Sequence, residues 1–181
     1  MLQCENSLLS RFMGLYKMKV AGNKAMTVVV MQNLFYTNLI IHQKYDLKGS
    51  TVKRFVSEKE IQNGVSVLKD LNFRTKIYLS SSSTTTLNNQ TKQTFLSNMK
   101  TDAAFLRECN IMDYSLLLGI NNNGETNTKI QKLAPLEKPT FWQQRDGGIP
   151  AGSNNGDPRE ETYFIGIIDI LQKVSIPCYV I

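Results

Sequence analysis

The sequence predicts an α+β fold built around one core. Short apolar runs rich in β-branched residues occur at strand length near both ends of the chain. In the middle of the chain, the stretch that starts at Lys92 carries apolar residues at helical spacing. With 181 residues, 41% hydrophobic and 20% charged, the chain is long enough to enclose one domain core.

The first strands are predicted near the N-terminus. Apolar and polar residues alternate after Phe12, within Leu8 to Val20, and Met26 to Met31 is the β-branched apolar run MTVVVM. The turn sequence AGNK at Ala21 to Lys24 joins them, so we expect two adjacent strands. Residues 33–57 mix short apolar pieces with basic residues, and their pattern predicts no definite element.

A helix is predicted in the middle of the chain. The polar, low-complexity stretch Ser80 to Asn89 predicts a loop or the lead-in to a helix. After Lys92 the apolar residues recur every three or four positions, which gives a helix one apolar face directed at the core and an end near Asn110. The residues predicted on that face are Leu96, Met99, Ala103, Leu106 and Cys109.

Two acidic residues adjoin predicted strands. The run SLLLGI at Ser115 to Ile120 predicts a short buried strand, so Asp113 lies in the turn between the helix and that strand. Residues 121–162 are rich in Asn, Gly and Pro and predict a long exposed loop, followed by the apolar run YFIGIIDIL from Tyr163 to Leu171. If the two strands form a hairpin, Asp113 and Asp169, 56 residues apart, lie at the same edge.

Two carboxylates at a strand edge, beside a basic surface, suit phosphoryl transfer. One accepts the proton of an attacking hydroxyl, and the other holds a divalent metal on the nucleotide phosphates. A structural alternative assigns Asp113 to a turn cap and pairs Asp169 with a lysine. Spacing alone favours this alternative, because carboxylates in turns are common.

Charge and composition restrict the partners. The net charge of +6 and the pI near 9.2 favour anionic partners. Basic residues are not interleaved with an aromatic platform, so we expect no nucleic acid partner. Three distant cysteines and a single histidine argue against a zinc site or a disulfide framework. No apolar run has membrane-spanning length and the first residues show no secretory leader, so we expect a reduced, cytoplasmic chain.

Several segments, in order, resemble the phosphatidylinositol phosphate kinases, and most closely the phosphatidylinositol 4-phosphate 5-kinases. The resemblance extends from about Asn6 to Leu171 and is interrupted only by the Ser/Thr-rich and Asn/Gly-rich loops. The matching segments are NSLLSRFMGLYKMK, VVVMQNLF, KYDLKGSTVKR, VLKDLNF, IMDYSLLLGI, DGGI and YFIGIIDIL.

The resemblance implies a two-lobed fold distantly related to the protein kinases. Residues 1–35 would be the remainder of the N-lobe with the hinge, and residues 36–181 the C-lobe, with loops near 80–91 and 121–162. The implied activity is transfer of phosphate from ATP, with Mg²⁺, to the 5-hydroxyl of phosphatidylinositol 4-phosphate. This reaction takes place at the cytosolic face of a membrane, where the protein would bind the anionic phosphoinositide surface.

The resemblance also assigns roles to the two acids and to the residues of the hinge. Asp113, in IMDYSLL, matches the catalytic-loop aspartate, and Asp169, in IID, matches the metal-binding aspartate. Asn33 and Phe35, in MQNLF, match the hinge that meets the adenine of ATP. For these two residues the structural alternative is an ordinary strand end followed by a core aromatic.

A basic stretch matches the part of the family that lies close to the cleft and the lipid headgroup. It contains Lys48, Lys53 and Arg54, in DLKGSTVKR. Arginine suits bidentate recognition of phosphate, whereas lysine contributes a point charge. A solvated basic strand is the competing interpretation, above all for Lys53.

The chain also departs from the family pattern. The glycine-rich loop and the N-lobe lysine are not found before the matched region, and no activation loop follows IIDIL. Leu118 stands where protein kinases place a metal-binding Asn. A second hypothesis is therefore a truncated, inactive family member that binds anionic membranes or a partner kinase subunit, with a homodimer among its possible assemblies. The missing phosphate clamp is expected to lower the activity of this chain strongly.

Overall fold

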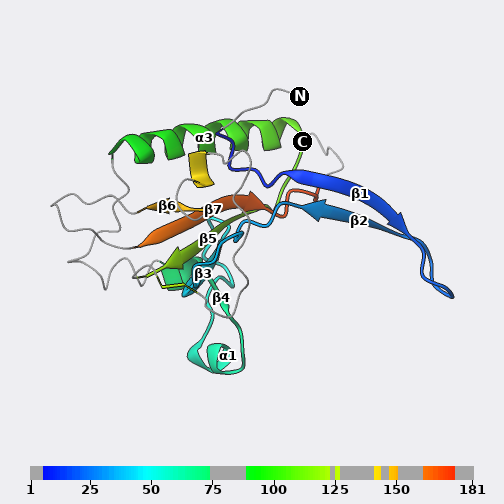
Figure 1. The fold of residues 1–181 in the computed structure, drawn as a ribbon, viewed down its shortest axis with the longest axis horizontal. Coiled ribbons are helices and arrows are strands. Elements are labelled where there is room, and N and C mark those ends of the chain that lie inside the picture. Colours follow the sequence, from blue (N-terminus) through cyan, green and yellow to red (C-terminus); the bar gives the residue numbers. More distant parts are fainter. Residues whose placement is uncertain are drawn as a thin grey trace, which may run out of the picture.

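The α+β class is confirmed by the computed structural model, which describes residues 6–73, 89–122, 125–126, 141–143, 147–150 and 161–173. The described strands form a two-stranded sheet and a separate five-stranded sheet, and a long helix lies against the larger sheet (Figure 1). No helix in these ranges is both long enough and apolar enough to cross a bilayer.

The smaller sheet is the hairpin that the N-terminal pattern predicts. Strands β1 (Phe12–Met18) and β2 (Met26–Met31) pair antiparallel, and the turn between them includes Gly22, whose φ of 83° favours glycine. Figure 1 shows the hairpin projecting away from the larger sheet. Most of its side chains are exposed on both faces, so it adds little to the core.

The larger sheet has the strand order β4-β3-β5-β7-β6. Its strands are β3 (Gln43–Leu47), β4 (Val67–Lys69), β5 (Ser115–Asn121), β6 (Ile149–Pro150) and β7 (Thr162–Ile168). Only β3 and β4 run parallel, and the other neighbours are antiparallel. The predicted hairpin of β5 and β7 is therefore confirmed, and both strands are almost completely buried.

Different parts of the chain cover the two faces of the larger sheet. Side chains of alternate residues, such as Leu118 and Ile165, join the main core cluster together with Leu106 of α3 (Asn89–Glu108). On the opposite face, Gly119 and Gly166 leave room for other chain segments. A Cβ at Gly119 would collide with the ring of Phe35, and one at Gly166 would meet Leu34.

Helix α3 exists as predicted, and Met99 and Leu106 of its predicted core-facing residues pack in the core. Leu96 is 49% exposed, so its assignment to the core was wrong. Phe95, which was not predicted on this face, packs against the core, and Asp102 is buried on the same side. Counting apolar residues alone missed these positions, because the helix buries the polar residues Thr91 and Asp102 and exposes Leu96.

The remaining elements are short. Helix α1 (Glu58–Gln62) begins at Ser57, whose hydroxyl accepts from the Glu60 backbone in a capping box, and η1 is Phe141–Gln143. The predicted loops near 80–91 and 121–162 fall largely outside the described residues. Of the described residues near these ranges, α3 starts at Asn89 and β6 lies inside the second range.

Candidate catalytic site

Asp113 and Asp169 lie at the same end of the central hairpin. The last paired residues of β5 and β7 at this end are Ser115 and Ile168. Asp113 lies two residues before Ser115, and Asp169 directly follows Ile168. The register thus brings the two acids to one edge, as the hairpin hypothesis predicts, although they are distant along the chain.

The segments that carry the two acids pair again beyond them, away from β5 and β7. Ile111 forms an isolated antiparallel bridge with Lys173, so the two segments are paired again just beyond the acids. Between the bridge and the strands, Asp113 and Asp169 both adopt left-handed backbone conformations, with φ of 59° and 61°. Such conformations are uncommon outside glycine and often occur at functional sites.

The end of α3 determines where the segment before Asp113 leaves the helix. Asn110 adopts a left-handed conformation with φ of 54°, and its N–H donates to the carbonyl of Arg107 at 3.0 Å. The N–H of Ile111 donates to the carbonyl of Leu106 at 2.9 Å. These two bonds form a Schellman motif, which satisfies carbonyls at the helix end and stops the helix where the sequence predicts.

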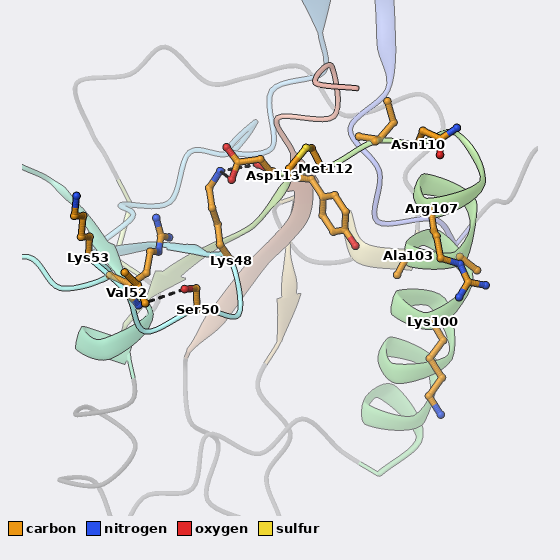
Figure 2. A pocket seen from close by; sticks show the side chains of 14 residues that line it. Lys48, Ser50, Val52, Lys53, Lys100, Ala103, Arg107, Asn110, Met112 and Asp113 are labelled. Carbon is orange, nitrogen blue, oxygen red and sulfur yellow. Dashed lines mark hydrogen bonds and ion pairs between the residues drawn. The ribbon is translucent and has the colours of Figure 1, made fainter. Parts of the chain in front are cut away.

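Lys48 contacts Asp113 directly. Its Nζ lies 2.9 Å from Oδ1 of Asp113 and donates to the backbone carbonyl of the same residue at 2.6 Å (Figure 2). The side chain of Lys48 is 21% exposed and that of Asp113 54% exposed. One carboxylate oxygen is therefore oriented by an ammonium group, while the carboxylate as a whole stays accessible from solvent.

The loop that carries Lys48 is anchored by Asp70. The backbone N–H groups of Lys48 and Gly49 donate to Oδ1 of Asp70 at 3.1 Å and 2.9 Å. Gly49 has a φ of 69°, a conformation that glycine adopts without strain. The position of the Lys48 ammonium thus depends on the carboxylate of the residue that directly follows β4.

Arg54 forms an ion cluster beneath this loop. Its Nε donates to Asp70 at 2.7 Å, and one terminal nitrogen donates to the carbonyl and, at 3.1 Å, to the carboxylate of Asp46. Burial disfavours ionisation of Asp70, but hydrogen bonds from Arg54 and Gly49 outweigh it, so the pKa of this carboxyl lies below its ordinary value. Burial likewise lowers the pKa of Arg54, but its two carboxylate partners raise it by more. The guanidinium that the resemblance assigns to lipid binding is therefore held by internal carboxylates.

The segment that contains Asn33 and Phe35 covers the face of the larger sheet opposite α3. The side chain of Asn33 accepts from the Phe35 N–H at 3.0 Å, which forms a tight turn after β2. The Phe35 ring meets the Phe164 ring edge-on at 6.3 Å between centroids, and Nζ of Lys44 lies 5.6 Å from its centroid. These contacts agree with the strand-end and packed-aromatic alternative, and the adenine contact stays a prediction.

An open groove of about 1260 Å³ brings four of the seven predicted site residues together. They are Lys48, Lys53, Arg54 and Asp113. Asn33, Phe35 and Asp169 do not line it. The other wall consists of α3 and includes Lys100 and Arg107, which the sequence reasoning missed (Figure 2). One helix face carries a basic residue, two alanines and a second basic residue, at positions 100, 103, 104 and 107. This spacing could have identified the wall.

Asp169 is the residue that could hold a metal ion. Its carboxylate is exposed at the end of β7, and carboxylate oxygen is the ligand type that Mg²⁺ prefers. No ion pair joins it to a lysine among the described residues, contrary to the structural alternative. Nor do these residues contain a cluster of three His, Cys, Asp or Glu side chains. A single carboxylate suits Mg²⁺, which commonly takes its remaining ligands from substrate phosphates and water.

The geometry can be compared with known proteins. Residues 1–177 match the family model described as phosphatidylinositol-4-phosphate 5-kinase. The chain belongs to the phosphatidylinositol phosphate kinase family. The motifs that carry the resemblance therefore reflect true relatedness, and the recognition of the family is confirmed.

Individual relatives support the same family. The chain is 34% identical to phosphatidylinositol 5-phosphate 4-kinase type-2 alpha of Homo sapiens, over 91% of its own length and 47% of the relative. It is 33% identical to the type-2 gamma enzyme of Xenopus tropicalis, with 92% and 46% covered. It is 31% identical to a protein of Dictyostelium discoideum named as a probable phosphatidylinositol phosphate kinase, with 94% and 30% covered. The chain thus spans 30% to 47% of the length of these relatives.

Proposed function

We propose that the protein carrying this chain phosphorylates the inositol ring of a phosphatidylinositol monophosphate, with ATP as donor. The strongest support is that Asp113, Asp169 and Lys48 lie at the same end of the β5–β7 hairpin. Family membership supports the same chemistry. An acid that handles a proton, an acid that binds a cation and an ammonium beside them are the parts that phosphoryl transfer needs.

Asp113 acts on the attacking hydroxyl. Its carboxylate is half exposed at the groove, and only one of its oxygens contacts Lys48. The free oxygen accepts the hydroxyl proton as the inositol oxygen attacks the γ-phosphorus of ATP, and ADP leaves as the bond between the γ-phosphorus and the bridging oxygen breaks. Lys48 fixes the orientation of the carboxylate through its two bonds to this residue, and its positive charge also attracts the phosphate that is transferred.

Asp169 holds Mg²⁺, which neutralises charge on the ATP phosphates when it is bound. Its position at the end of β7 supports this role, because Asp113 lies two residues before the adjoining strand β5. Asn33 and Phe35 contact the adenine from the turn after β2, where the β1–β2 hairpin meets the larger sheet. In this proposal residues 1–35 are the remainder of the N-lobe and residues 36–181 the C-lobe of a kinase-like fold.

The substrate is phosphatidylinositol 4-phosphate, and the 5-hydroxyl receives the phosphate. The wording of the matched motifs and the description of the family model support this choice, whereas the human and frog relatives are named as 5-phosphate 4-kinases. Either reaction yields phosphatidylinositol 4,5-bisphosphate. The substrate isomer, and not the product, therefore distinguishes the two activities.

The protein works at the cytosolic face of a membrane. The loop between β3 and α1 supports this location, because Val52 is 75% exposed and Phe55 55% exposed, with Lys53 between them. Exposed apolar side chains next to a cation suit the interface of an anionic bilayer. The loop is held from beneath by the Arg54 cluster, so it is presented to the bilayer in a fixed conformation.

The test compares the two substrate isomers. The full-length protein is incubated with labelled ATP, Mg²⁺ and vesicles that contain either phosphatidylinositol 4-phosphate or phosphatidylinositol 5-phosphate. We expect labelled bisphosphate mainly from the 4-phosphate, and loss of turnover in an Asp169→Asn variant that still binds the vesicles. Faster turnover of the 5-phosphate would reverse the substrate choice. Vesicle binding without turnover on either lipid would favour the inactive binding role.

A further inference from the structure

We propose that Lys100 and Arg107, on the α3 wall of the groove, form a second anion-binding site that takes a phosphate monoester. This inference rests on the proposed function, because it names where the phosphate already present on the lipid headgroup would bind. Figure 2 shows both side chains on α3, across the groove from the loop that carries Lys48 and Lys53.

The helix places these two cations on one face. Positions 100 and 107 are separated by two helical turns, or roughly 10 Å along the axis. Ala103 and Ala104, which also line the groove, occupy the turn between them. A helical side chain leans toward the N-terminal turn, so Arg107 extends over the alanines in the direction of Lys100. Small residues at that turn leave space in which an anion can approach both cations.

The α3 wall carries no compensating carboxylate toward the groove. Asp102 points to the opposite side of the helix, where it is 4% exposed and accepts from Ser7 Oγ at 2.9 Å and Leu8 N–H at 2.7 Å. Within the described residues, no carboxylate forms an ion pair with Lys100 or Arg107. Both cations are therefore available to an anion from solution.

The balance of charge in the groove selects the ligand. The lining residues include five cationic side chains and a single acidic one, Asp113. The cationic residues are Lys48, Lys53, Arg54, Lys100 and Arg107. Two of them are already held by carboxylates, and the other three remain to bind anions. A phosphate monoester fits this surplus, because its charge is high and its oxygens match the fork of an arginine.

The position of the site relative to Asp113 gives it a role. Arg107 is the penultimate residue of α3, and the chain reaches Asp113 six residues later. A headgroup whose phosphate binds the α3 wall can therefore present another part of its ring toward Asp113 and Lys48. The wall would favour rings that already carry a phosphate over unphosphorylated inositol.

The test measures binding and needs no turnover. The full-length protein is titrated with soluble inositol 1,4-bisphosphate, and separately with inorganic phosphate, for wild type, Lys100→Gln, Arg107→Gln and the double variant. Lys92→Gln is the matched control, because Lys92 is an exposed lysine of the same helix outside the groove lining. We expect about tenfold weaker headgroup binding for each groove variant and less than a twofold change for the control.

The outcomes separate the source of the phosphate. If inorganic phosphate binds as tightly as the headgroup and loses affinity in the same variants, the site stands and its ligand is a free phosphate. If the double variant binds both ligands like wild type, the site does not exist. An Asp113→Asn variant should lose turnover and keep headgroup binding, so failure of this inference is distinguishable from failure of the proposed function.

Discussion

Replacing Arg54 by alanine should destabilise the protein strongly, although the resemblance assigns this residue to the substrate. The substitution leaves Asp46 and Asp70 as neighbouring carboxylates without their common cation. Removing one partner of a fully buried pair costs about 3–5 kcal/mol. The side chains of Arg54, Asp46 and Asp70 are 12%, 24% and 15% exposed, so water partly replaces the lost bonds. We therefore expect the free energy of unfolding to fall by about 2–3 kcal/mol.

Two variants serve as controls for this prediction. Lys53→Ala removes a neighbouring exposed cation and should change stability by less than about 0.5 kcal/mol. Arg54→Lys keeps the charge but loses the planar fork, so it should cost an intermediate amount. Urea unfolding followed by far-UV circular dichroism gives the free energies. If Arg54→Ala is as stable as Lys53→Ala, the ion cluster is not a structural element, and the residue is free to bind the lipid.

Three further predictions follow from other contacts. The pKa of Asp70 is lowered in the folded state, so its ionised carboxylate stabilises the fold. This contribution to the free energy of unfolding is complete above the unfolded pKa of about 3.9 and is lost as the pH falls through the folded pKa. Asp70→Asn should therefore flatten the acid branch of a plot of melting temperature against pH. Lys48→Ala should lower kcat by about a hundredfold yet change stability by less than about 1 kcal/mol, since its partner Asp113 is 54% exposed; steady-state kinetics and urea unfolding check the two parts. Gly119→Ala should cost about 1–3 kcal/mol because its Cβ collides with Phe35, and Phe35→Leu in the same chain should recover part of that loss in a double-mutant cycle.

Much of the hairpin and helix arrangement could be predicted from local pattern. The β-branched runs that became β2 and β7 are unbroken and of strand length, and both were identified. The pairing of β5 with β7 could also be inferred, because two apolar strands need a partner on each edge. Strand β3 could not, since its five residues include three polar ones and its burial depends on two neighbouring strands.

The site was harder to predict because it depends on long-range contacts. The Lys48–Asp113 contact joins residues 65 positions apart, and no local pattern indicates it. The sequence showed that Arg54 is basic but not that two carboxylates enclose it. Lys100 and Arg107 were visible at helical spacing, but only the folded chain places their helix face opposite the basic loop.

The most direct test of the central claim is the turnover of an Asp113→Asn variant. The full-length protein and the variant are compared with labelled ATP and phosphatidylinositol 4-phosphate vesicles, at matched protein concentration and after confirmation of equal melting temperatures. If Asp113 accepts the hydroxyl proton at the end of the β5–β7 hairpin, kcat should fall by a factor of about 10²–10⁴ while vesicle binding is retained. Equal turnover by the two proteins would contradict the account and remove this carboxylate from the chemistry.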